Sequence, residues 1–245
     1  MIHTAYDVMK EYLVTGAVLD GEYQIPMLPQ TNVVPTKGID FVSSKSRTLK
    51  GHKDLTVNFY IDDKSFLQVW NQTDSCIEHL KCFSSVCSPD FTVASGMPSA
   101  LNIFNLYRNH AIGYYWSVMG VNIIPSVNII SPKEIPWIYD GTPRRSTVSC
   151  CTNGRVRSKA ARMEFCENFK EMIYTIEPVK VVIVGIVPDE LNVDVPIINL
   201  NSRSQNMKEM FGKERRWEQL VKGQQNAEVR KQNDRRSGKQ RLLVP

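Results

Sequence analysis

From Leu55 onward, short apolar runs alternate along the chain with segments whose apolar positions recur at helical spacing. The runs that we expect to be strands are residues 55–62, 84–88, 121–130, 146–152, 179–187 and 195–201. The segments that we expect to be helices are residues 64–72, 98–119 and 158–176. Strands and helices that alternate in this way are typical of parallel βαβ units. The pattern therefore predicts an α/β fold of repeated βα units with a mainly parallel sheet, either barrel-like or open and twisted.

The two long predicted helices differ in how much of their surface is apolar. In residues 158–176, Phe165 and Phe169 belong to one apolar stripe, as expected for a helix with one buried face. In residues 98–119, apolar side chains cover nearly the whole circumference, so this helix should be buried on most sides. Arg108 lies in this second helix, and a buried arginine needs a partner.

Composition and charge divide the chain into four parts. Residues 1–50 are poorly periodic and contain three prolines between positions 26 and 35, which predicts an extended N-terminal wrap. Residues 51–200 form the predicted α/β core domain. Residues 201–222 have one apolar face and are expected to form a helix that docks on the core, whereas residues 223–245 should be a basic, disordered tail. The net charge of +5 arises in the C-terminal part, since residues 201–245 hold 12 Lys or Arg and 5 Asp or Glu.

Carboxylates follow two of the predicted strands at the point where each strand ends. Asp62 and Asp63 end the run "FYIDD", and Asp90 follows the strand "SSVCS". Ligands of parallel α/β proteins lie outside the carboxyl ends of the strands, so these acids stand where a site is expected. Asp62 and Asp90 are candidate ligands of Mg²⁺ or Mn²⁺, which prefer carboxylate oxygens. Asp is also a good cap and turn former, so each acid could instead begin the next helix or loop.

The candidate catalytic residues at these strand ends are Asp62, Asp63, Asp90 and Arg108. In an enzyme, the Asp side chains would bind the metal and Arg108 would stabilise charge during phosphoester hydrolysis or transfer. The alternative is that Arg108 forms a structural ion pair with one of the three acids.

A basic turn separates the predicted strand 146–152 from the predicted helix 158–176. The candidate phosphate ligands in it are Asn153, Gly154, Arg155, Arg157 and Lys159, at the positive end of the helix dipole. The turn lacks the GxxxxGK[ST] spacing of a Walker loop, which argues against that kind of nucleotide binding. The alternative is a solvated basic turn capped by Ser158.

The cysteines and the apolar runs indicate the cellular setting. The six cysteines form no CxxC pair and show no zinc-site spacing, so we expect free, structural thiols. No apolar run approaches the ~20 residues that span a bilayer, and the N-terminus lacks the layout of a signal peptide. These features predict a cytoplasmic protein with no membrane partner.

Five stretches, in this order, form a series of motifs: "FYIDD", "SPDF", "MPSALNIFNLYRNHAIGYYW", "IIPSVN" and "DGTPRRSTVSCCTNG". Through them the chain resembles a family of domains of unknown function found in Firmicutes and related gut bacteria, their phages and mobile elements. The similarity covers roughly residues 20–190. It implies a phage or mobile-element protein inside a bacterial host cell and implies no particular reaction.

The basic tail interleaves Arg and Lys with Gln and Asn, a composition that suits nucleic-acid backbones but is also found in solubilising tails. Its candidate contacts are Arg230, Lys231, Arg235, Arg236, Lys239 and Arg241. The leading hypothesis is a phage or mobile-element protein that associates with DNA or RNA, with a strand-end pocket that binds phosphate or a divalent metal. Two alternatives stay open: a non-catalytic module that binds a host protein, and an enzyme that acts on a small anionic metabolite.

Overall fold

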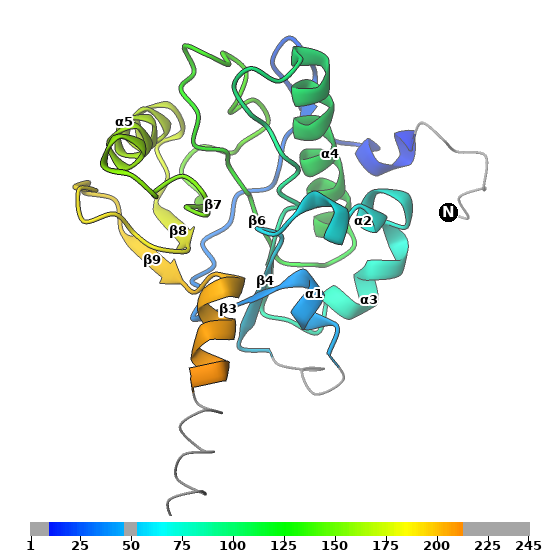
Figure 1. Cartoon of the computed structure of the whole chain (residues 1–245). Coiled ribbons are helices and arrows are strands. Elements are labelled where there is room, and N and C mark those ends of the chain that lie inside the picture. Colours follow the sequence, from blue (N-terminus) through cyan, green and yellow to red (C-terminus); the bar gives the residue numbers. More distant parts are fainter. Residues whose placement is uncertain (1–9, 47–52, 213–245) are drawn as a thin grey trace, which may run out of the picture. The chain divides into compact units, whose positions relative to one another are not determined.

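The computed structural model describes residues 10–46 and 53–212, and the chain divides into two compact units, Met1–Arg203 and Ser204–Pro245. In the first unit, one parallel sheet has the strand order β3-β4-β5-β6 and a second has the order β7-β8-β9 (Figure 1). The strands are β1 Leu19–Asp20, β2 Ile25–Pro26, β3 Lys37–Asp40, β4 Leu55–Asn58, β5 Ser85–Cys87, β6 Ile123–Ile124, β7 Thr147–Cys151, β8 Lys180–Val184 and β9 Ile197–Leu200. The predicted α/β fold with parallel strands is confirmed.

The two parallel sheets adjoin where the chain leaves β6. Ser126 pairs with Ser149 of β7 in an isolated parallel bridge, and the Val127 amide donates a hydrogen bond to the Ser149 carbonyl at 2.8 Å. At the opposite edges, β3 and β9 approach closely at Gly38, where a Cβ atom would lie 3.1 Å from Cβ of Leu200. No strand pairing joins β3 to β9 within the described residues, so the strands do not form a closed barrel.

Two long helices lie between the strands in sequence, as predicted. The helices are α1 Phe41–Ser44, α2 Gln68–Asn71, α3 Ile77–Leu80, α4 Ser99–Val118 and α5 Lys159–Ile176, and the 3-10 turns are η1 Glu11–Val14, η3 Asp63–Ser65 and η4 Asp74–Cys76. α4 begins directly after Pro98, which cannot donate a backbone hydrogen bond and so suits a helix start. α5 begins after Ser158, whose hydroxyl accepts a hydrogen bond from the Ala161 amide at 3.2 Å.

Three clusters of buried apolar side chains hold these elements together. α4 places Ile112 and Trp116 among the aromatic side chains that follow β4 and β5. α5 packs its apolar stripe, which includes Phe165 and Phe169, against β7 and β8. The third cluster draws side chains from both parallel sheets: Tyr60, Cys87, Ile124, Val182, Val184 and Leu200. The two sheets therefore share one core, and their carboxyl ends meet around a common space.

The segment expected to be an extended wrap also contributes strands. β3 forms the edge of the four-stranded sheet by pairing in parallel with β4, and β1 and β2 form a short antiparallel ribbon. The helix expected over residues 64–72 is shorter than predicted, because the turn η3 replaces its beginning. Residues 203–212 are helical, whereas the rest of the predicted docking helix and the whole tail 223–245 lie outside the described residues.

Candidate functional site

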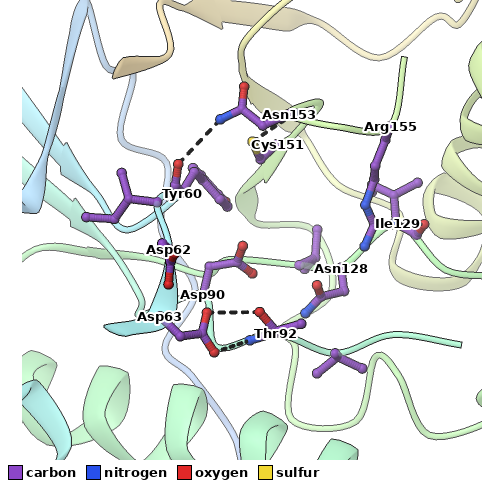
Figure 2. A pocket seen from close by; sticks show the side chains of 13 residues that line it. Tyr60, Asp62, Asp63, Asp90, Thr92, Asn128, Ile129, Cys151, Asn153 and Arg155 are labelled. Atoms are coloured by element: carbon purple, nitrogen blue, oxygen red, sulfur yellow. Dashed lines mark hydrogen bonds between the residues drawn. The ribbon is translucent and has the colours of Figure 1, made fainter. Parts of the chain in front are cut away.

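The carboxyl ends of β4, β5 and β7, together with the segment that follows β6, surround a cavity of about 340 Å³ (Figure 2). We call it the strand-end pocket. Its polar lining includes Asp62, Asp63, Asp90, Asn128, Asn153 and Arg155. Parallel α/β folds collect their ligand sites at this edge of the sheet, so the position of the pocket follows from the topology. The strand ends followed by Asp62, Asp90 and Asn153 in the sequence therefore lie close together.

The first of the three carboxylates has a local structural role. Asp62 caps the turn η3, where its side chain accepts a hydrogen bond from the Lys64 amide at 3.2 Å. The Lys64 ammonium group also lies 2.9 Å from the other Asp62 oxygen. Hydrogen bonds from Lys64 lower the pKa of Asp62 below its ordinary value. Asp62 therefore lines the pocket as an ionised, already paired group.

The second carboxylate ties two loops together. The oxygens of Asp63 accept hydrogen bonds from the Thr92 amide at 3.0 Å and from the Thr92 hydroxyl at 2.9 Å (Figure 2). This contact joins the loop after β4 to the loop after β5. Asp63 thereby fixes the wall of the pocket in which Asp90 lies.

The third carboxylate, Asp90, has no such partner. It lies between Pro89 and Phe91, and Phe91 is completely buried in the core. Oδ1 of Asp90 is inaccessible to solvent and has no hydrogen-bond partner among the described residues. Burial raises the pKa of Asp90 from 3.8 to about 7, Arg155 opposes this shift, and the charge of Asp63 adds to it. Asp90 is therefore a carboxyl group that can hold or release a proton near neutral pH.

Arg155 supplies the positive charge of the pocket. Its Nη1 donates a hydrogen bond to the Ile129 carbonyl at 2.7 Å, which fixes the guanidinium group beside the segment that follows β6. No ion pair within 4.0 Å joins Arg155 to Asp90, and Figure 2 shows the two side chains on different sides of the pocket. An anionic group could occupy the space between them and accept hydrogen bonds from the remaining donors of Arg155.

Hydroxyl groups beneath the pocket fasten the strand ends to one another. The Tyr60 hydroxyl donates to Oγ of Ser149 at 2.9 Å, and the Ser126 hydroxyl donates to the Ser88 carbonyl at 2.6 Å. Burial raises the pKa of the nearby Cys87 thiol to about 12, so this thiol stays protonated. All six cysteines are free, and four of them are buried: Cys76, Cys87, Cys150 and Cys166. The structural role expected for the six thiols stays a prediction.

The predicted phosphate-binding residues divide into two groups. Asn153 and Arg155 line the strand-end pocket, and Gly154 lines a neighbouring cavity. Arg157 and Lys159 are exposed and line neither cavity. Residues 153–158 form turns and bends and not an extended segment, so two arginines only two positions apart have different surroundings.

Arg108 lies behind the pocket wall and is not part of the lining. Its guanidinium carbon lies 3.9 Å from the ring centre of Phe91 and 4.7 Å from that of Phe104. One of its terminal nitrogens also donates to the side chain of Asn105. Burial lowers the pKa of Arg108, and the charge of Asp63 opposes that effect. These contacts place Arg108 in a supporting position, and its role as a charge stabiliser stays a prediction.

The structure gives limited support to the predicted metal site. Within residues 10–46 and 53–212, no group of three or more His, Cys, Asp or Glu side chains is arranged to hold a metal ion. Asp62 has Lys64 as a partner and Asp63 has Thr92, so of the three acids only Asp90 offers an unpaired oxygen. Metal binding by Asp62 and Asp90 therefore stays a prediction.

Sequence reasoning missed several residues of the pocket. Tyr60, Thr92 and Cys151 also line it. Thr92 could have been found from its position two residues after Asp90, since alternate residues of an extended segment share a face. The six predicted nucleic-acid contacts of the tail lie outside the described residues. In the part of the chain that the structure describes, no helix combines the length and apolar character needed to cross a bilayer.

The chain belongs to the family described as a domain of unknown function (DUF4417), which matches residues 17–201. It is similar to the Gene 1 protein of Mycobacterium phage L5, with 28% identity over 64% of this chain and 68% of that protein. It is also similar to the Gene 1 protein of Mycobacterium phage D29, with 26% identity over 64% of this chain and 58% of that protein. No solved structure matches the chain. The resemblance to an uncharacterised, phage-associated family is confirmed.

Proposed function

We propose that this phage-associated protein binds nucleic acid and receives a phosphate group of it in the strand-end pocket, beside Arg155. The observation that carries the proposal is that the pocket lining holds the cation Arg155 and the half-buried carboxyl group of Asp90, with no ion pair between them. Oδ1 of Asp90 is buried and has no hydrogen-bond partner in the described part of the chain. Arginine is the side chain best suited to phosphate oxygens, because its planar group donates two parallel hydrogen bonds. The basic composition of residues 223–245 supports the same class of ligand.

Asp90 gives the proposed pocket a second property. A carboxyl group with a pKa of about 7 is partly protonated at neutral pH, so it can donate a hydrogen bond to a phosphate oxygen. The same group can exchange a proton with a ligand hydroxyl, as a general acid or base. We assign Asp90 to proton transfer in any reaction that this pocket performs, and Arg155 to the stabilisation of negative charge.

The proposal can be tested by fluorescence anisotropy with a labelled single-stranded octanucleotide and the full-length chain. Arg155→Gln should weaken binding by about tenfold to a hundredfold, the value of a hydrogen bond to a charged group of about 1.5–3 kcal/mol. Arg157→Gln is the matched control, because it removes the same charge two residues away and outside the lining. Equal affinities of the two variants would contradict a phosphate site at Arg155.

The tail is tested in the same assay by its effect on salt dependence. A chain that ends at Lys222 lacks six Lys or Arg residues, so the slope of log affinity against log salt should fall by up to about 4. No binding of DNA or RNA by the full-length chain at low salt would overturn the proposal.

An enzyme that acts on a small anionic metabolite is the second candidate. It is favoured by the size of the strand-end pocket, about 340 Å³, which is within the range of ~300–1,000 Å³ that small ligands occupy. This function needs the pocket and not the tail. Full activity of the chain that ends at Lys222, together with no nucleic-acid binding, would favour this candidate.

A further inference from the structure

A second cavity lies next to the strand-end pocket and shares two lining residues with it. This cavity of about 380 Å³ is formed by one face of α5, the segment after Val93 and the segment after Ile129. Both linings include Ile129 and Arg155. The guanidinium group of Arg155, fixed on the Ile129 carbonyl, therefore stands where the two cavities meet. We call the second cavity the α5 pocket.

The charges of the two cavities have a definite order. Arg155 is the one Lys or Arg among the described residues that line either cavity. The α5 pocket holds the carboxylates of Glu134 and Glu164, and the strand-end pocket holds those of Asp62, Asp63 and Asp90. The combined groove thus presents acceptors at both ends and a cation in the middle. A matching ligand is anionic at its centre and carries hydrogen-bond donors on both sides.

We propose that the two cavities form one groove for an internal phosphodiester of a nucleic-acid strand, with one nucleoside in each cavity and the phosphate at Arg155. Nucleosides carry the required donors, as sugar hydroxyls and as amino and imino groups of the bases. A terminal phosphate or a free mononucleotide would leave one of the two cavities empty. This inference rests on the proposed function, and it specifies which part of the nucleic acid occupies the site.

The residue that tests the inference is Glu164 of α5. Its side chain lines the α5 pocket, is exposed, and has no hydrogen bond or ion pair to another described residue. A carboxylate with free oxygens can accept hydrogen bonds from a sugar hydroxyl or from a base amino group. Because Glu164 lines the α5 pocket and not the strand-end pocket, it should contact only a ligand that extends past Arg155 into the α5 pocket.

The experiment measures the affinity of the full-length chain by isothermal titration calorimetry. The probes are the dinucleoside monophosphate ApA, the mononucleotides 5′-AMP and 3′-AMP, and inorganic phosphate. We expect ApA to bind at least tenfold more tightly than either mononucleotide. Glu164→Ala should remove most of this difference and should weaken the binding of at most one of the two mononucleotides, the one whose nucleoside occupies the α5 pocket. Glu167→Ala is the matched control, since Glu167 is exposed on the same helix and lines neither cavity.

The results separate this inference from the proposed function. Equal affinities for ApA and the mononucleotides, all lost in Arg155→Gln, would overturn the two-cavity groove and leave a phosphate site at Arg155. Tighter binding of ApA that Glu164→Ala does not change would also overturn the groove, because the second nucleoside would then lie elsewhere. Failure of all four probes to bind would remove both the groove and the proposed phosphate site.

Discussion

Replacement of Asp90 by Asn should stabilise the protein at neutral and alkaline pH and have little effect in acid. The two side chains have the same shape, so the substitution removes the charge without opening a cavity. In the unfolded chain the Asp90 carboxyl group has its ordinary pKa of 3.8, whereas burial raises it to about 7 in the native state. Between these values the native state holds a proton that the unfolded state has lost. Stability therefore falls as the pH rises from about 4 to about 7.

The size of the effect follows from the shift of the pKa. Each unit of difference between the two states corresponds to about 1.4 kcal/mol, so a shift of about 3 units gives an upper bound of about 4 kcal/mol. Asn cannot ionise and avoids this cost. Relative to wild type, Asp90→Asn should gain almost no stability at pH 4 and up to about 4 kcal/mol at pH 8.

Urea denaturation followed by tryptophan fluorescence provides the assay, since Trp116 is completely buried and should report unfolding. Free energies of unfolding would be measured at several pH values from 4 to 8. Asp62→Asn is the control of opposite sign, because Lys64 lowers the pKa of Asp62 and so favours its ionised form. Above pH 4, the Asp62→Asn variant should be less stable than wild type, and at no pH should it be more stable. A stability difference between Asp90→Asn and wild type that stays constant from pH 4 to pH 8 would refute the reasoning.

Three further predictions concern backbone strain, capping and thiol reactivity. Gly185→Ala should cost about 2–4 kcal/mol in the urea assay and Gly154→Ala about 1 kcal/mol, because both glycines have positive φ but only a Cβ at position 185 would collide with Thr152. Ser158→Ala should cost about 1 kcal/mol by removing the cap of α5. Cys82 is the exposed thiol, so a chromogenic disulfide reagent should modify one thiol rapidly in the native protein, and Cys82→Ser should abolish this phase.

The long helices could be predicted from the sequence because their patterns repeat over several turns. α5 begins and ends within one residue of the expected bounds, where Ser158 caps it and its apolar stripe stops. The strands were found less accurately. The run 55–62 was expected to be one strand, but pairing ends at Asn58 while Phe59 and Tyr60 remain buried. The pattern of apolar residues predicts which side chains are buried, and here the buried side chains extend beyond the last hydrogen-bonded residue of the strand.

β3 shows a different limit of sequence reasoning. Its four residues, "KGID", include a glycine and carry too few apolar positions to establish a period of two. The strand forms because β4 offers a free edge, and because Gly38 leaves room for the close approach of Leu200 from β9. Both reasons are tertiary and cannot be read from a short window of sequence.

The candidate site was predicted in position but not in chemistry. Topology alone brings the ends of parallel strands together, so the acids after β4 and β5 could be placed in one pocket. Their different roles depend on contacts that no spacing reveals. Asp62 meets Lys64 two residues away, whereas Asp63 meets Thr92 across 29 positions. Asp90 differs from both, because its Oδ1 is inaccessible to solvent and has no hydrogen-bond partner among the residues that the structure describes.

This difference between the acids bears on function. A buried carboxyl group without a partner lowers the stability of the fold, and an asparagine of the same shape would avoid that loss. Groups of this kind concentrate at functional sites, where a perturbed pKa serves binding or proton transfer. Asp90 combines the perturbed pKa with a place in a cavity and a cation across from it. For these reasons a substitution of Asp90 that raises the stability of the fold should weaken ligand binding or proton transfer in the strand-end pocket.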